Sequence, residues 1–182
     1  MAKYREIVYD VLKDLKQVYD DSAITNYQIL WWVSMVANKF LKQHLDNEYQ
    51  RTGEKSGKFL TIFPNVKIQT SFVPKGRKYI DLPGILIDMD YNRSIEYITY
   101  QPEDEQAPAF SNVRFYLTTP AKAQLLQATH ETPTPQNPYA YVAGQKLYFL
   151  GIETVDIKEV ELGLYLAIDP RQVEDLDAEC PL

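Results

Sequence analysis

The stretch that most constrains the fold is residues 24–45, ITNYQILWWVSMVANKFLKQHL. Apolar residues occur there on most sides of a helical wheel, which is typical of a helix that is covered on several sides. Thr25 followed by Gln28 forms the pattern of a capping box, so we expect the helix to begin there. Polar and charged residues interrupt the run and exclude a membrane span. The stretch predicts a buried scaffold helix, with one of Trp31 and Trp32 in the core.

A first amphipathic helix is predicted over residues 3–19, where apolar side chains recur at three- and four-residue steps. Together with the scaffold helix it makes a helical hairpin of residues 1–52. We expect the second helix to fray after Leu45, because a polar run begins there. Residues 47–57, NEYQRTGEKSG, are expected to form a loop.

From Lys58 onward the hydrophobic period changes to two, and Pro, Gly and Asn residues separate short β-rich runs. This spacing predicts an antiparallel β-sandwich or barrel-like domain over residues 58–169, so the fold class is α+β. Thr119-Pro120 predicts the start of one short helix. A hairpin is expected to turn near Ala143-Gly144. The expected strands are FLTIF, VKIQTSFV, KYIDL, ILIDMD, SIEYITY, VRFYL, the two arms of YAYVAGQKLYFLGI, and VELGLYLAI.

Charge divides the chain unevenly. The net charge of −6 argues against a nucleic-acid binder as a whole. Residues 1–80 hold 13 Lys and Arg against 8 Asp and Glu, giving +5, whereas residues 81–182 hold 6 against 17, giving −11. One interpretation is chance combined with an acidic tail at residues 170–182. The other is two surfaces of opposite sign that meet partners or each other.

The ends and the single cysteine bear on where the chain is made. Cys180 is the only cysteine, which excludes an internal disulfide. The N-terminal residues mix charges and lack an apolar core segment, so we expect no signal peptide. We therefore expect a soluble chain that is made in a cytosol.

Three short motifs resemble chemical sites, and each lacks a necessary part. GEKSGK at residues 53–58 resembles a phosphate-binding loop, but its spacing is one residue short and Phe59 replaces the required Ser or Thr. Asp88 and Asp90 could share one face of a strand end, but two carboxylates rarely hold Mg²⁺ or Mn²⁺ alone. His130-Glu131 opens like a zinc-protease motif, but the second His is missing and Pro133 breaks the helix.

The remaining reactive side chains are too scattered to predict a site. His44 is the only other histidine, and Cys180 lies far in sequence from both histidines, which disfavours a thiol nucleophile. We therefore predict a protein that is not an enzyme, with no catalytic residue, no metal site and no cofactor.

Several segments together resemble a known family. They are the helical opening from Tyr4 to Leu45, the block KYIDLPGILIDMDYNRSIEYITY with FSNVRFYLTTPAKAQLL, and PTPQNPYAYVAGQKLYFLGIETVDIKEVELGLYLAIDP. The chain resembles the ring proteins, or head–tail connectors, of crAss-like tailed bacteriophages. The resemblance implies a virion structural protein that forms a dodecameric ring below the portal. Genomic DNA would pass through the channel without specific binding, and no membrane would be involved. The family has no active-site motif to carry over.

Two other functions remain open on the residues alone. A β-sandwich module that binds a sugar or peptide would show an aromatic cluster on one exposed face and would be a stable monomer. A hydrolase would have to use Asp88, Asp90 and His130. Ring formation, ligand binding and metal-dependent activity separate the three.

Overall fold

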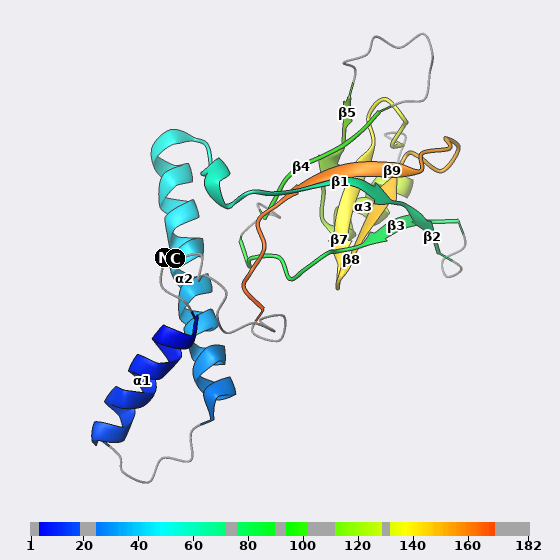
Figure 1. Ribbon diagram of the computed structural model, residues 1–182. Helices are drawn as coiled ribbons and strands as arrows, with labels where there is room; N and C mark the ends of the chain where they lie inside the picture. Colours follow the sequence, from blue (N-terminus) through cyan, green and yellow to red (C-terminus); the bar gives the residue numbers. More distant parts are fainter. Residues whose placement is uncertain are drawn as a thin grey trace. The chain divides into compact units, whose positions relative to one another are not determined.

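The computed structural model describes residues 4–18, 25–71, 76–89, 94–101, 112–128 and 132–169. These residues form three α-helices, one 3-10 turn and nine strands (Figure 1). The chain separates into two compact units, one of residues 1–56 with 167–182 and one of residues 57–166. The domains expected from the sequence, 1–52, 58–169 and 170–182, stay a prediction.

The helical unit contains α1 (Tyr4–Val18) and α2 (Asn26–Thr52), which pack against each other. The predicted capping box is confirmed, because the Gln28 amide donates to the Thr25 hydroxyl and the Thr25 amide donates to the Gln28 side chain. The predicted end after Leu45 is wrong. α2 continues to Thr52 because residues 46–52 contain no Gly or Pro and include the good helix formers Glu48, Gln50 and Arg51. It ends where Gly53 takes a left-handed conformation, with φ of 77°.

The β unit is a sandwich-like pair of sheets and not a closed barrel, so the predicted α+β class is confirmed. One sheet has the strand order β1-β9-β4-β5 and the other has the order β2-β3-β8-β7-β6. All described pairings are antiparallel except that of β6 with β7, which is parallel. The bounds are β1 (Thr61–Lys67), β2 (Gln69–Thr70), β3 (Lys78–Asp81), β4 (Ile95–Tyr100), β5 (Val113–Arg114), β6 (Tyr116–Leu117), β7 (Tyr139–Ala143), β8 (Lys146–Leu150) and β9 (Glu159–Leu164).

The core lies between the two sheets because alternate residues of each strand point inward. In β9, Val160, Leu162 and Leu164 are buried while Glu159 and Glu161 are exposed, as the alternation predicts. The facing sheet contributes buried side chains from β3, β7 and β8 to the same cluster. The main members of this cluster are Ile80, Ile95, Ile98, Phe115, Ala140, Leu147, Phe149, Val160, Leu162 and Leu164.

One predicted strand, VRFYL, belongs to both sheets. Its first two residues form β5 in one sheet and its last two form β6 in the other. Phe115 between them is buried, and its amide donates to the carbonyl of Ile98. The short helix α3 (Pro120–Ala128) follows, and the β7–β8 hairpin turns at Gly144, as the sequence predicts.

Two strand predictions need correction. Pro64 and Asn65 were expected to form a turn, but they form an irregularity inside β1, where Asn65 has φ of 57°. An edge strand tolerates this because Pro lacks the amide that an inner strand would need. Residues 85–89 of the ILIDMD run were expected to be a strand, but Leu86 forms only an isolated bridge with Leu166. Asp90 lies outside the described residues.

Candidate assembly surface

The covered side of α2 is only part of its circumference. Its buried residues are Ile29, Leu30, Ser34, Ala37 and Leu45, and they lie toward one side of the helix. Across the middle of the helix this side is narrow, and it contains the small residues Ser34 and Ala37. A helix that is covered on one side should show charged or polar residues on the other. α2 departs from this rule.

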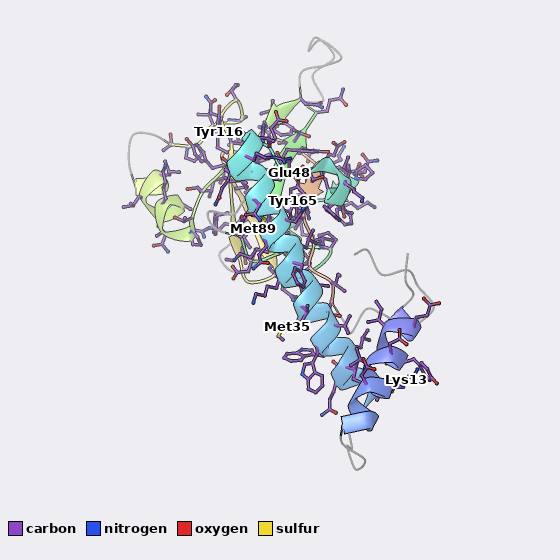
Figure 2. The ribbon with its side chains drawn as sticks, turned by 90° about the vertical axis from the view of Figure 1, so that its left-hand side faces the viewer. Lys13, Met35, Glu48, Met89, Tyr116 and Tyr165 are labelled. Atoms are coloured by element: carbon purple, nitrogen blue, oxygen red, sulfur yellow. The ribbon has the colours of Figure 1, made fainter. Side chains whose placement is uncertain are left out.

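The opposite side of α2 exposes large apolar residues. Six of them keep between 41% and 61% of their surface open to solvent, namely Tyr27, Trp31, Trp32, Met35, Val36 and Phe40. Figure 2 shows Met35 on the part of α2 that carries other exposed side chains. The prediction that this helix is covered on several sides is therefore wrong for a single chain. The prediction that one of the two tryptophans lies in the core is wrong as well.

The size of this face is comparable to that of the largest apolar patch on a typical monomer. Each aromatic side chain buries roughly 150–250 Å² when it is covered, so six half-exposed residues leave on the order of 500 Å² of apolar surface open. The largest apolar patch on a typical monomer is about 300–600 Å² and is often functional. Residues 26–45 contain no Asp or Glu, while Lys39, Lys42 and His44 are cationic or titratable. The face is therefore apolar with a few basic neighbours.

A polar clamp, formed by the Asn38 side chain and the backbone of Ile168, holds a later segment of the same chain against α2. The Asn38 side-chain amide donates to the Ile168 carbonyl at 3.0 Å, and the Ile168 amide donates back to Asn38 Oδ1 at 2.7 Å. Both residues belong to the helical unit. Because the clamp satisfies both backbone groups of Ile168, it holds the segment after β9 along one side of the helix and leaves the apolar side free.

The outer face of the five-stranded sheet carries a row of tyrosines. Tyr79, Tyr148 and Tyr141 are cross-strand neighbours on β3, β8 and β7. The rings of Tyr141 and Tyr148 stack at 5.3 Å between centroids, and Arg77 donates to the Tyr141 hydroxyl. Lys146 lies 4.0 Å from the centre of the Tyr79 ring. This row is the aromatic cluster that a ligand-binding module would need, but α3 packs on it through Ala123, and Tyr141 is buried.

Lys146 also shows how the charges of this row are balanced. Desolvation lowers the pKa of Lys146, but the hydrogen bond and charge of Tyr79, together with the Asp81 carboxylate, outweigh it and raise the pKa above its ordinary value. Lys146 Nζ lies 3.7 Å from the Asp81 carboxylate. The cation therefore has its partners within the sheet.

An open cleft of about 1090 Å³ lies in the β unit. Tyr100, Pro135, Asp156, Lys158 and Glu159 contribute to its lining. Its walls mix one basic and several acidic side chains and do not converge on one point. In the described part of the chain, no group of three His, Cys, Asp or Glu side chains is placed to hold a metal ion.

The motifs that resembled chemical sites do not assemble into one. Gly53 of the GEKSGK run is the C-cap of α2, and Lys58 lies exposed over the ring of Phe59. His44 pairs with Glu48 at 3.7 Å, one helical turn away. Asp88 is exposed. The partners Asp90, His130, Glu131 and Cys180 lie outside the described residues. The absence of a catalytic, metal or cofactor residue therefore stays a prediction.

Sequence reasoning missed Met35 and placed one of Trp31 and Trp32 in the core, whereas both are exposed. The signal was present, because Trp31 and Met35 are four residues apart, as are Trp32 and Val36. What the sequence does not reveal is which side of an apolar helix its own chain covers. Among the described residues, α1 packs on α2 and the Asn38 side chain holds Ile168 against it.

The fold and this face together define a class of protein. Exposed apolar patches of this size mark sites of protein or membrane interaction. Within the described ranges, no helix has the length and apolar character needed to cross a membrane. An exposed apolar face of this kind is typical of a subunit that packs against another protein surface.

The chain belongs to the family of phage tail ring protein 2, whose sequence profile matches residues 6–182. The resemblance to ring proteins of crAss-like phages is thereby confirmed. The protein is a structural component of the phage virion and works in a ring together with other tail proteins. A comparison with curated proteins gives no match.

Proposed function

We propose that this chain forms a closed dodecameric ring in the connector between portal and tail and encloses the channel through which the genome leaves. The observation that carries the proposal is the exposed apolar face of α2 in a chain of a ring-protein family. A lone subunit keeps such a face in water at a cost in free energy, whereas a ring covers it in every copy.

The role is structural and not catalytic. DNA passes through the channel without specific binding, which is supported by the net charge of −6. Portal and other connector or tail proteins contact the ring from above and below, and no membrane takes part. The chain is made in the cytoplasm of the host bacterium.

The uneven charge adds orientation to the contact. Away from the apolar face of α2, basic side chains of residues 1–80 meet acidic side chains of residues 81–182 of the neighbouring copy. Opposite charges guide association and discourage like-to-like pairing, while apolar area supplies most of the affinity. Exposed charges are screened within about 10 Å at 0.1 M salt, so added salt should slow assembly more than it shrinks the finished ring.

The position in the particle is tested by imaging. Purified chain is mixed with portal and examined by cryo-electron microscopy, and virions that carry a tagged copy are imaged in parallel. We expect one ring of density coaxial with the portal and a tag at the connector. Particle classes with no ring, together with a tag elsewhere on the virion, would refute the proposal. Mass photometry across a salt series then gives the copy number and the role of charge.

The alternative is a β-sandwich module that binds a sugar or peptide. The row of Tyr79, Tyr148 and Tyr141 favours it. α3 weighs against it, because Tyr141 is already covered. Calorimetric titration with oligosaccharides and with extended peptides separates the two: saturable binding that Tyr148→Ala abolishes, by a chain that stays monomeric, would favour the module.

A further inference from the structure

The exposed apolar face of α2 divides into two stripes. The first stripe is Tyr27, Trp31 and Met35, and the second stripe is Trp32, Val36 and Phe40; within each, residues are four apart and lie above one another. At 3.6 residues per turn, the two stripes point in directions about 140° apart around the helix axis. On the shorter arc between them lie Gln28 and Lys39, which are both exposed.

We propose that the first stripe of one copy packs against the second stripe of the next copy, so that α2 helices stand side by side around the ring. This inference rests on the proposed function and specifies its contact. A closed ring needs two different patches on every subunit, whereas a two-fold dimer needs only one. α2 carries two separate apolar patches on one rigid element, which is what a subunit with a neighbour on each side requires.

The occupant of each stripe is a second copy of this chain. Both stripes are apolar, each spans eight residue steps, or about 12 Å of helix, and the two have matching lengths. Each contact covers one stripe from each of two copies, on the order of 500 Å² together, which is about a third of the roughly 1,600 Å² that a standard interface buries in total. Stripes of residues four apart are also the ridges that packed helices interdigitate most often.

The angle between the stripes agrees with closure. If the two neighbours of a subunit lie in directions about 140° apart, the line that joins successive α2 helices bends by about 40° at each copy. That line closes into a ring after roughly nine copies. With a packing scatter of about 15–20°, this range includes twelve. The concave side of the ring is then the shorter arc, which places polar Gln28 and Lys39 toward the channel.

The offset between the stripes fixes the tilt of the helix. The stripe centres, Trp31 and Val36, are five residues or about 7.5 Å apart along the axis. When neighbouring helix axes are about 8–10 Å apart, all copies lie at the same height along the ring axis only if each α2 is inclined by about 40° to that axis. An upright helix would instead produce a rising spiral that never closes.

The test uses two full-length double variants. The first-stripe variant is Trp31→Glu with Met35→Glu, and the second-stripe variant is Val36→Glu with Phe40→Glu. The control is Asn47→Glu with Gln50→Glu, which makes the same charge change at exposed positions of α2 beyond the C-terminal end of the stripes. Native mass spectrometry gives the assembly state. Far-ultraviolet circular dichroism confirms folding, because all the altered residues are exposed.

We expect the unaltered chain and the control to form rings and each stripe variant alone to be monomeric. Mixing the two variants should give one-to-one dimers, because the intact second stripe of one variant can pack on the intact first stripe of the other. The dimers grow no further, because both remaining stripes carry the substitutions. Rings formed by either variant alone would overturn the inference. Dimers formed by a single variant would do so too, because they indicate like-to-like contact.

The outcome is independent of the position in the particle. Rings that survive both double substitutions would refute the stripe contact while leaving the connector role to the tagged virions. An unaltered chain that stays monomeric at its highest soluble concentration would also refute the contact. A tag located away from the connector would refute the proposed function while the mixed-dimer result stands.

Discussion

The sharpest prediction for the sandwich concerns Gly163, which lies in β9 opposite Tyr97 of β4. A Cβ added at Gly163 would stand 2.5 Å from Tyr97 Cε1 and 2.8 Å from its Cδ1, so Gly163→Ala forces the ring to move. Overpacking of this kind costs about 1–3 kcal/mol. The displaced ring also loses its 2.9 Å hydrogen bond to Glu161, for about 1 kcal/mol more. Reduced freedom of the unfolded chain returns roughly 0.4–1 kcal/mol, which leaves a net loss of about 2 kcal/mol.

Urea denaturation followed by circular dichroism measures this loss, and a second background shows its cause. In a Tyr97→Ala chain the added methyl group has space, so Gly163→Ala should then cost less than about 0.5 kcal/mol. Tryptophan fluorescence is the control, because both tryptophans lie in α2 of the other unit. An equal loss in the two backgrounds would show that the Tyr97 ring is not what the methyl group meets.

Three further outcomes follow from described contacts. Asn38→Leu removes both bonds to Ile168 and should speed hydrogen exchange of the Ile168 amide about tenfold, whereas Asn38→Asp keeps the acceptor and should protect it; equal rates would contradict the clamp. Trp32→Ala should cost roughly 1 kcal/mol in thermal unfolding of the monomer, because Trp32 is half exposed, and a loss above about 3 kcal/mol would mean a covered side chain. Burial raises the pKa of Tyr97 and Tyr100 above 10.0, with Glu161 contributing at Tyr97, so the folded state holds their protons longer and stability should fall as pH rises above 10.0 toward the raised pKa values. A urea midpoint that does not fall across that range would contradict this assignment.

Much of the fold follows from local patterns. The capping box at Thr25, the alternation in β9 and the turn at Gly144 each depend on residues within a few positions of one another. The sequence contains these signals directly. The assignment of strands to sheets does not follow from them, because the segment around Phe115 has one period and yet pairs with both sheets. Pairing depends on distant strands, which the local pattern cannot specify.

The assembly surface shows a different limit. Trp31 and Val36 are of residue types that occur in protein cores. A single sequence does not say whether such side chains are covered by their own chain or by another one. The predicted end of α2 is wrong for a local reason: a polar run is not a helix stop by itself, and the first residue after Leu45 that ends a helix is Gly53.

The edges of the two sheets have a consequence for aggregation. β1 is an edge strand interrupted by Pro64 and Asn65, and the other edge strands, β2, β5 and β6, have only two residues each. Unpaired edges are templates on which chains stack into fibrils, and proline, irregularity and short length all blunt them. The described strands therefore offer other chains little unpaired backbone on which to stack, so association of this chain has to depend mainly on side-chain contacts.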